Sequence, residues 1–280
     1  MYRELATGPI GVNVPFEEAA RLARAHGFQA LSLSVGVIQE HSAAKVRDIL
    51  AANGLRAGTS GVPVNFRGDD ATFEEGLAEL PTGAALLQAV GCTRVLTWFM
   101  PFHDTLPYED NFRQLASRSG RIARVLGDHG IRYGLEFVGP ATLRAGKAHP
   151  FIYDIDGLLR LIDAIDADNV GFLLDAFHWY TSGGTRADLE KLSDDLIVGV
   201  HVNDGYAGRS AEEQIDQERA MPGETGVIDI GTFMRALDAM GYSGPVIVEP
   251  FSQRIRSLPP DEAVAETAAS LDKIWQIAGL

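Results

Sequence analysis

The sequence contains a single cysteine, Cys92, in 280 residues. One cysteine cannot form an intramolecular disulfide and cannot supply a zinc site of paired thiolates. Cys92 follows Gly91 at the start of an apolar stretch. We therefore expect it to be a small core residue rather than a nucleophile.

Basic residues are scarce relative to acidic ones. Lys and Arg total 24 against 38 Asp and Glu, which gives a formal net charge of −14. Nucleic-acid affinity depends on neutralising phosphates with Lys and Arg, so this balance argues against a nucleic-acid partner. The apolar runs are far shorter than the roughly 18 residues of a membrane helix, and the first residues lack the apolar core of a signal peptide. We expect a cytoplasmic protein with no membrane partner.

A glycine-rich phosphate fingerprint is missing, because no G-x-G-x-x-G opens a helix. Linkers rich in Pro, Gly or Ser are missing too. What the chain has is eight short apolar runs that alternate with amphipathic stretches, and such continuous apolarity is typical of parallel strands covered on both faces. The sequence predicts an α/β fold, a single (β/α)₈ TIM barrel in one domain over residues 1–280. The expected strands lie within residues 8–14, 28–34, 55–64, 93–99, 131–138, 170–175, 196–204 and 244–251.

Helical periodicity is clearest in four of the stretches between these runs. Three of the four end on glycine (Gly27, Gly130 and Gly241), a residue that often stops a helix in the left-handed conformation. A further helical stretch over residues 72–91 contains Pro81, so we expect an interruption there. The four clear helices lie within residues 16–27, 111–130, 154–166 and 231–241, and a shorter one lies within 41–54.

Polar side chains end four consecutive strands of the expected barrel. Glu136, Asp175, His201 and Glu249 are each the first strongly polar residue at the end of an apolar run. In such barrels the catalytic residues lie at the carboxyl ends of the strands. Three carboxylates in one pocket would raise one another's pKa unless a cation compensates for their charge. With one imidazole they form a donor set suited to one divalent ion, Mn²⁺, Mg²⁺, Co²⁺ or Zn²⁺.

Each of these residues also has a purely structural interpretation. A single glutamate at a strand end is more often an ion-pair partner or a solvated loop residue. His201 by itself could be a satisfied core histidine. Four such residues at matching positions on successive strands favour the metal interpretation.

The same residues carry a resemblance. The segments "LEF", "LLDAFHWYTSGG", "GVHVNDG", "RAMPGETGVID" and "VIVEPF" resemble the xylose-isomerase-like TIM-barrel superfamily of sugar phosphate isomerases and epimerases, over essentially the whole chain. This superfamily includes ketose 3-epimerases, hydroxypyruvate isomerase, inosose isomerases and dehydratases, and a more distant endonuclease IV branch. The endonuclease branch needs more histidines than the seven present here.

The resemblance implies roles for individual residues. One metal ion is bound at the positions of Glu136, Asp175, His201 and Glu249, and the two glutamates also act as the acid/base pair. His178 and Arg219 contact substrate oxygens. The loop from Asn203 to Met221 is longer than in the epimerases, so Arg209 is an alternative to Arg219.

Other residues near the expected strand ends are weaker candidates. Trp98 could stack on the C–H face of a sugar or pack at the barrel rim, and the same holds for Phe99 and Trp179. Asn13 ends the expected first strand and could reach a substrate hydroxyl or cap a loop. Glu224 in "PGETG" could contact substrate or fix a turn.

The predicted function is a metal-dependent sugar isomerase or epimerase. A metal chelated by a carbonyl and an adjacent hydroxyl acidifies the neighbouring C–H, and a carboxylate can then remove the proton to give an enediolate. The substrate would be a ketose, a keto-inositol or a related polyol. Loss of a β-hydroxyl would make the enzyme a lyase on a keto-inositol or 3-keto sugar, and a non-catalytic sugar-binding barrel is a lesser alternative. The sequence leaves the exact substrate, the choice of metal, manganese included, and a homo-oligomeric state open.

Overall fold

The computed structural model describes all 280 residues. Its main sheet has nine strands in the order β3-β2-β1-β11-β10-β9-β7-β5-β4, and every neighbouring pair is parallel. A second, antiparallel pair is formed by β6 and β8. The strands are β1 Tyr2–Leu5, β2 Ala30–Leu31, β3 Arg56–Ala57, β4 Ser60–Gly61, β5 Arg94–Phe99, β6 Phe102–His103, β7 Arg132–Phe137, β8 His149–Pro150, β9 Val170–Asp175, β10 Ile197–Val202 and β11 Pro245–Val248.

The two edge strands of the main sheet, β3 and β4, are separated in the chain by only two residues. β3 pairs with β2 and β4 pairs with β5, while Gly58 and Thr59 lie between β3 and β4 in the chain. The amide of Leu33 donates to the carbonyl of Thr59, so the interruption itself is also bonded to its neighbour. β3 and β4 therefore share the third of eight strand positions, and the sheet closes into the TIM barrel that the sequence predicts.

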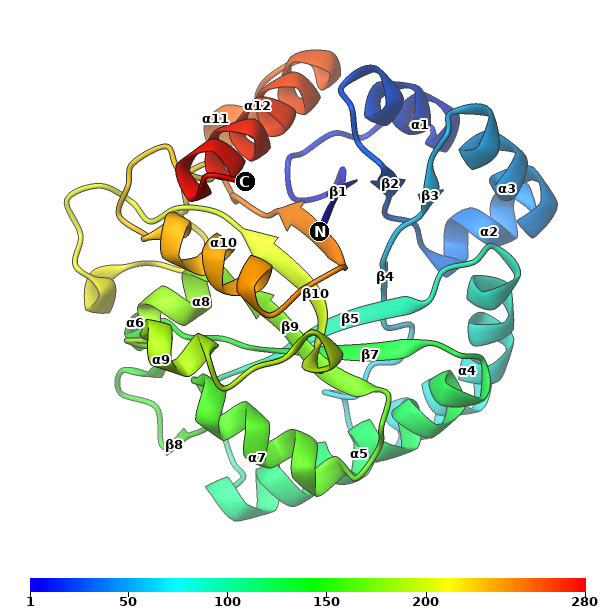
Figure 1. Ribbon diagram of the computed structural model, residues 1–280. Coiled ribbons are helices and arrows are strands. Elements are labelled where there is room, and N and C mark those ends of the chain that lie inside the picture. Colours follow the sequence, from blue (N-terminus) through cyan, green and yellow to red (C-terminus); the bar gives the residue numbers. More distant parts are fainter.

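Helices follow the strands and form the outer layer around the sheet (Figure 1). The predicted helices are present, and Gly27, Gly130 and Gly241 all have the positive φ of a left-handed stop, between 67° and 76°. The helices are α1 Phe16–Ala25, α2 Val35–His41, α3 Ala43–Ala52, α4 Asp70–Ala89, α5 Tyr108–Asp128, α6 Ala141–Arg144, α7 Ile155–Ile165, α8 Ala176–Thr181, α9 Arg186–Leu189, α10 Ile230–Ala239, α11 Gln253–Arg256 and α12 Pro260–Ala278, with 3₁₀ turns at Asp194–Leu196 and Ala211–Glu213.

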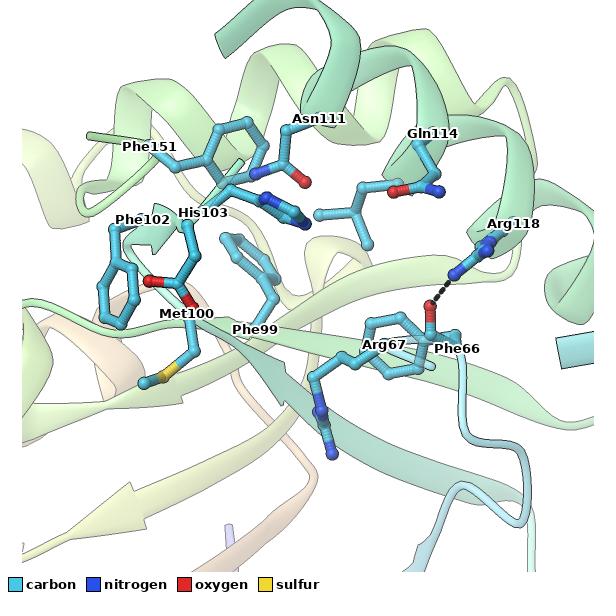
Figure 2. A pocket seen from close by; sticks show the side chains of 12 residues that line it. Phe66, Arg67, Phe99, Met100, Phe102, His103, Asn111, Gln114, Arg118 and Phe151 are labelled. Carbon is cyan, nitrogen blue, oxygen red and sulfur yellow. Dashed lines mark hydrogen bonds between the residues drawn. The ribbon is translucent and has the colours of Figure 1, made fainter. Parts of the chain in front are cut away.

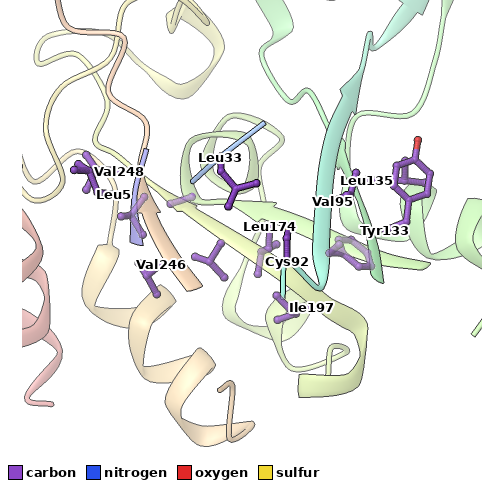
Figure 3. Close-up of a cluster of buried hydrophobic side chains, with 14 of the residues drawn as sticks. Leu5, Leu33, Cys92, Val95, Tyr133, Leu135, Leu174, Ile197, Val246 and Val248 are labelled. Carbon is purple, nitrogen blue, oxygen red and sulfur yellow. The ribbon is translucent and has the colours of Figure 1, made fainter. Parts of the chain in front are cut away.

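Two hydrophobic clusters fill the molecule. The larger joins the outward face of the strands to the helices and includes Leu5, Val95 and Cys92, which is fully buried as predicted (Figure 3). The smaller consists of Leu96, Leu173, Val198 and Ile247. A Cβ at Gly134 or Gly199 would contact Leu96, so these glycines leave room for large side chains inside the barrel. This packed interior supports the polar residues at the ends of the strands.

The prediction of the first strand is wrong. β1 is Tyr2–Leu5, whereas residues 8–11 of the expected strand lie in a turn, with Gly11 at φ 74°. The true strand has polar residues on both faces, since Glu4 is buried and Arg3 pairs with Asp272 on the outside. Its hydrophobic pattern therefore could not identify it.

The expected interruption at Pro81 is also wrong. α4 runs unbroken from Asp70 to Ala89 with Pro81 inside it. Pro81 is on the exposed side of the helix, where water can satisfy the backbone carbonyl that loses its partner. No helix in the structure has both the length and the apolar character needed to cross a membrane.

Candidate metal and active site

Four polar side chains meet at the carboxyl ends of neighbouring strands. Glu136 lies in β7, Asp175 ends β9, His201 lies in β10 and Glu249 directly follows β11. The parallel register places His201 beside Asp175. One carboxylate oxygen from each acidic residue and one ring nitrogen of His201 all lie within 4.8 Å of one another. The structure therefore brings together all four residues that the sequence analysis selected as metal ligands.

His201 lies at the centre of this cluster. Its Nδ1 is 3.3 Å from Oε1 of Glu136, 3.5 Å from Oε2 of Glu249 and 3.8 Å from Oδ2 of Asp175. Glu136 Oε1 and His201 Nδ1 are buried and form no hydrogen bond. Buried polar atoms without a partner are costly, so this pair is suited to a bound group that accepts electron pairs from both atoms. A divalent metal ion meets that requirement.

The two glutamates differ in proton affinity. Burial raises the pKa of Glu136 to about 8, and the negative charges of Glu249 and Asp175 add to the rise. Burial acts in the same direction on Glu249, but His201 and Arg219 outweigh it and hold the pKa of Glu249 below its ordinary value. Two carboxyl groups whose pKa values are pushed apart are suited to opposite roles in proton transfer.

Asp175 is oriented by the start of the next helix. Its Oδ1 accepts the backbone N–H groups of Phe177 and His178 at 2.6 and 3.1 Å, so it is the N-cap of α8. Its Oδ2 accepts Nη1 of Arg219 at 3.0 Å and Nδ2 of Asn203 at 3.0 Å. Although burial opposes it, the charge of Arg219 and these N–H groups lower the pKa of Asp175. The carboxylate is thus held charged with one oxygen toward the cluster.

Arg219 links this cluster to the long loop after β10. Its side chain is buried between the rings of Phe177 and Phe251, with Cζ 4.6 and 4.7 Å from their centroids. Nη1 donates to Asp175 and Glu249, and Nη2 donates to Asp216 at 2.9 Å. The alternative candidate Arg209 instead pairs with Glu218 on the surface. Of the two arginines, the structure places Arg219 in the site.

His178 points toward the same space from α8. The backbone N–H of Gly139 donates to its Nδ1 at 3.2 Å, and its Nε2 lies 3.3 Å from Nη2 of Arg219. Burial lowers the pKa of His178, which favours the neutral imidazole. With Nδ1 accepting a proton donor, the neutral ring carries its proton on Nε2. Oδ1 of Asp216 already lies 2.9 Å from Nη2 and 3.8 Å from Nε2, so a substrate oxygen placed between the two nitrogens would share them with this carboxylate.

A cavity of about 620 Å³ opens above these groups. Trp98 is 42% exposed at its rim, as a stacking residue would be. Trp179 is buried instead, donates from Nε1 to the carbonyl of Thr185 and packs on Phe233. The cavity is lined by Trp98, Met100, Glu136, Val138, Thr142, Leu143, His178, Ile215, Asp216, Gln217, Arg219, Glu249 and Phe251.

Two of the weaker candidates lie elsewhere. Asn13 is exposed in the loop before α1 and does not line the cavity, because the first strand ends at Leu5 rather than near residue 14. Glu224 accepts the backbone N–H of Met221 at 2.9 Å and fixes the turn there.

Sequence reasoning missed two polar residues of the site and one buried carboxyl group of the barrel interior. Asn203 is fully buried and donates to both oxygens of Asp175. Asp216 binds Arg219 through its carboxylate and its carbonyl. Glu4 is buried in β1 and accepts from Ser32 and Thr59. Asn203 comes two residues after His201, at the end of the same apolar run, and this position could have identified it. Asp216 and Glu4 lie outside any such run.

The sequence profile described as xylose isomerase-like TIM barrel matches residues 20–274. The chain belongs to this family. An inosose isomerase of Halalkalibacterium halodurans is 22% identical over 236 residues, which are 81% of this chain and 78% of that protein. A 3-dehydroshikimate dehydratase of Pseudomonas putida is 28% identical over 53% of this chain and 23% of its own length. A ketose 3-epimerase of Arthrobacter globiformis is 25% identical over 49% of this chain and 40% of its own.

Two solved structures have the same fold as this chain. A xylose isomerase domain protein from Alicyclobacillus acidocaldarius covers 100% of both chains with a TM-score of 0.88 and 29% identity. The IolI protein, solved with a bound zinc atom, covers 100% of this chain and 98% of its own with a TM-score of 0.84 and 18% identity. At 18% identity, the similarity to the IolI protein shows a shared fold and nothing more.

Proposed function

We propose that this member of the xylose isomerase-like family is a divalent-metal-dependent isomerase or epimerase of a ketose, a keto-inositol or a related polyol. The observation that carries the proposal is the convergence of Glu136, Asp175, His201 and Glu249 at the base of an open cavity. Relatives named inosose isomerase and ketose 3-epimerase support this substrate class.

The four residues of the cluster would hold the metal ion. Their donor set of carboxylate oxygens and one imidazole nitrogen contains no thiolate and is accepted by Mn²⁺, Mg²⁺, Co²⁺ and Zn²⁺. When bound, the ion supplies a Lewis acid that polarises a substrate carbonyl and makes the adjacent C–H more acidic. The buried Oε1 of Glu136 and Nδ1 of His201, which have no other partner, are the atoms that need it most.

Proton transfer is assigned to the two glutamates. Glu249, whose pKa is lowered, is the charged base that removes the proton beside the carbonyl. Glu136 is the acid that returns a proton. His178 and Arg219 would donate to the developing negative oxygen from Nε2 and Nη2, which lie 3.3 Å apart. In this scheme the remaining ligands Asp175 and His201 do not transfer protons.

A second candidate is a lyase that expels a β-hydroxyl from a keto-inositol or 3-keto sugar. The 3-dehydroshikimate dehydratase relative favours it, because elimination begins with the same proton removal. We also propose that residues 1–280 form one barrel domain that acts on a free small molecule in the cytoplasm.

One experiment separates these functions. The metal-loaded protein is incubated with a panel of ketoses and keto-inositols in D₂O, and the products are followed by NMR and ultraviolet absorbance. Deuterium at an inverted or retained centre identifies an epimerase or isomerase, while a new absorbing enone identifies the lyase. If neither signal arises with any substrate, or if Glu136→Gln and Glu249→Gln exchange as fast as the unaltered protein, the proposal is wrong.

A further inference from the structure

A second cavity lies behind the rim of the substrate cavity. It has a volume of about 250 Å³ and is enclosed by the start of α5, the β6 strand and the loop before α4 (Figure 2). Phe66, Phe99 and Phe151 are almost fully buried and give it an aromatic wall. The volume is slightly below the ~300–1,000 Å³ of typical small-ligand pockets, which suits a single monosaccharide-sized ring.

Three polar side chains of this cavity have groups that are free to bind a ligand. Asn111 and Gln114 lie three residues apart on α5, so their amides project from one face of the helix (Figure 2). Neither side chain forms a hydrogen bond within the protein. The third group is His103, whose Nδ1 accepts the N–H groups of Thr105 and Leu106 at 3.1 and 2.8 Å. The neutral ring therefore carries its proton on Nε2.

Of the three charged residues of the cavity, Arg67 and Arg118 are engaged by hydrogen bonds, and Asp104 has an exposed side chain whose Oδ1 lies 4.0 Å from Nζ of Lys147. Arg118 donates to the carbonyls of Phe66 and Gly68 and to Asp70, which fixes the loop before α4. Arg67 donates to the carbonyl of Trp98, and Figure 2 shows its guanidinium turned away from Asn111 and Gln114. No free cation is directed at the amides, so the cavity does not suit a phosphate or carboxylate. Amides that both donate and accept, beside aromatic rings, suit the vicinal hydroxyls and C–H face of a neutral sugar.

The two cavities share a wall at the end of β5. Met100 lines both of them. Trp98 faces the substrate cavity, Phe99 faces the second one, and Cζ of Arg67 lies 4.1 Å from the centroid of the Trp98 indole. Met100 is thus the residue over which a ligand in the substrate cavity would have to extend to enter the second one.

We propose that this cavity is a subsite for a second neutral sugar or cyclitol ring joined to the substrate, bound by Asn111, Gln114 and His103 against Phe99 and Phe151. The link to the substrate rests on the proposed function. The binding of the ring itself does not rest on the proposed function, because its hydrogen bonds use none of the four residues of the metal cluster. The subsite would make the enzyme prefer a glycosylated substrate over the free ketose.

The first test isolates the ring-binding step. Saturation-transfer NMR with methyl α-D-glucopyranoside and myo-inositol is run in EDTA on the unaltered protein and on an Asn111→Leu, Gln114→Leu double variant. The loss of two hydrogen bonds should weaken binding at least ~fivefold. Ser117→Leu on the exposed side of α5 should leave it unchanged. If the double variant has a much lower melting temperature than the unaltered protein, the single substitution Gln114→Met is tested in its place. The subsite is overturned if the unaltered protein does not bind the probes, or if the Asn111 and Gln114 variants bind them as tightly as the unaltered protein does.

The second test joins the subsite to the cluster. The metal-loaded protein is titrated with fructose and with its glucosyl derivatives turanose, maltulose, leucrose and isomaltulose. At least one disaccharide should bind ~fivefold or more tightly than fructose, and this gain should disappear in the double variant and remain in Ser117→Leu. If none of the disaccharides binds more tightly, the link to the substrate is wrong. Failure of the proposed function would instead appear as absent proton exchange with every ketose, while the ring probes still bind.

Discussion

Arg219 and Asp175 are 44 residues apart in sequence, and Nη1 of the arginine lies 3.0 Å from Oδ2 of the aspartate. The same Nη1 lies 3.0 Å from Oε2 of Glu249. One guanidinium nitrogen thus bridges two members of the cluster, and the arginine itself is buried. Breaking a buried ion pair by removing one partner costs about 3–5 kcal/mol, because the remaining charge loses its compensation.

The first prediction concerns this contact. Arg219→Lys keeps the charge but has three donors on one atom, which cannot replace the four hydrogen bonds that the guanidinium makes to Asp175, Glu249 and Asp216. We expect kcat/KM for proton exchange to fall at least ~100-fold and the free energy of unfolding in urea to fall by about 2 kcal/mol. Arg209→Lys, on the surface pair with Glu218, is the matched control and should change the unfolding free energy by less than ~0.5 kcal/mol. Equal effects of the two substitutions would contradict a role for Arg219 at the cluster.

The second prediction concerns metal affinity. His201→Ala removes the only nitrogen donor of the cluster, and we expect the affinity for Zn²⁺ or Mn²⁺ to fall at least ~100-fold. Competition against a fluorescent chelator measures the affinity, and elemental analysis measures the metal retained after purification. His129→Ala is the control, since His129 contacts Gln88 on the surface far from the cluster in the fold. Full metal retention in His201→Ala would remove His201 from the ligand set.

The four cluster residues could be selected from the sequence because their strands are buried on both faces. Every residue of β9 from Val170 to Asp175 is buried, so the run is uniformly apolar until its carboxylate. In parallel strands such run ends lie at one end of the barrel, and the register of β9 and β10 indeed sets Asp175 beside His201. The roles assigned to these residues are proposals for the experiments above.

The first strand and the loop after β10 could not be predicted in the same way. β1 has Glu4 inside the barrel and Arg3 outside, where the guanidinium Cζ of Arg3 lies over the Trp275 ring, 5.4 Å from its centroid. Such a strand has no apolar run. Arg219 is placed by contacts with Asp216, Phe177 and Phe251, which lie in three separate segments. The residues next to Arg219 in the sequence do not determine contacts with segments this far apart in the chain.

The third prediction concerns Glu4, a carboxyl group in the barrel interior. Burial raises the pKa of Glu4, although hydrogen bonds from Thr59 and Ser32 oppose the rise. The folded protein therefore keeps this proton to a higher pH than the unfolded chain, whose reference value is 4.5. The contribution of Glu4 to stability is greatest below pH 4.5 and falls as the pH rises toward the folded pKa.

Glu4→Gln stays neutral at every pH, so its free energy of unfolding should improve relative to the unaltered protein as the pH rises from 5 to 8. Urea denaturation in EDTA at several pH values measures the difference. Glu79→Gln, at an exposed position of α4, controls for the removal of one negative charge. A difference that stays constant over this pH range would mean that Glu4 is charged in the folded protein.

The last prediction concerns Gly139, which positions His178. A Cβ at Gly139 would lie 2.4 Å from the carbonyl oxygen of His178 and 2.6 Å from Oγ1 of Thr181, so alanine would push α8 away from the end of β7. Gly139→Ala should cost about 1–3 kcal/mol of unfolding free energy. It should also disturb the hydrogen bond from the Gly139 N–H to Nδ1 of His178 and raise KM more than it lowers kcat.

Gly8→Ala is the matched control, because a Cβ at Gly8 meets nothing within 4 Å. It should alter the unfolding free energy by less than ~0.5 kcal/mol and leave KM unchanged. Since Nε2 of His178 is assigned to a substrate oxygen, a Gly139→Ala protein that is destabilised but retains its KM would show that this imidazole only supports the structure. A rise in KM confined to Gly139→Ala would instead place the ring against the substrate.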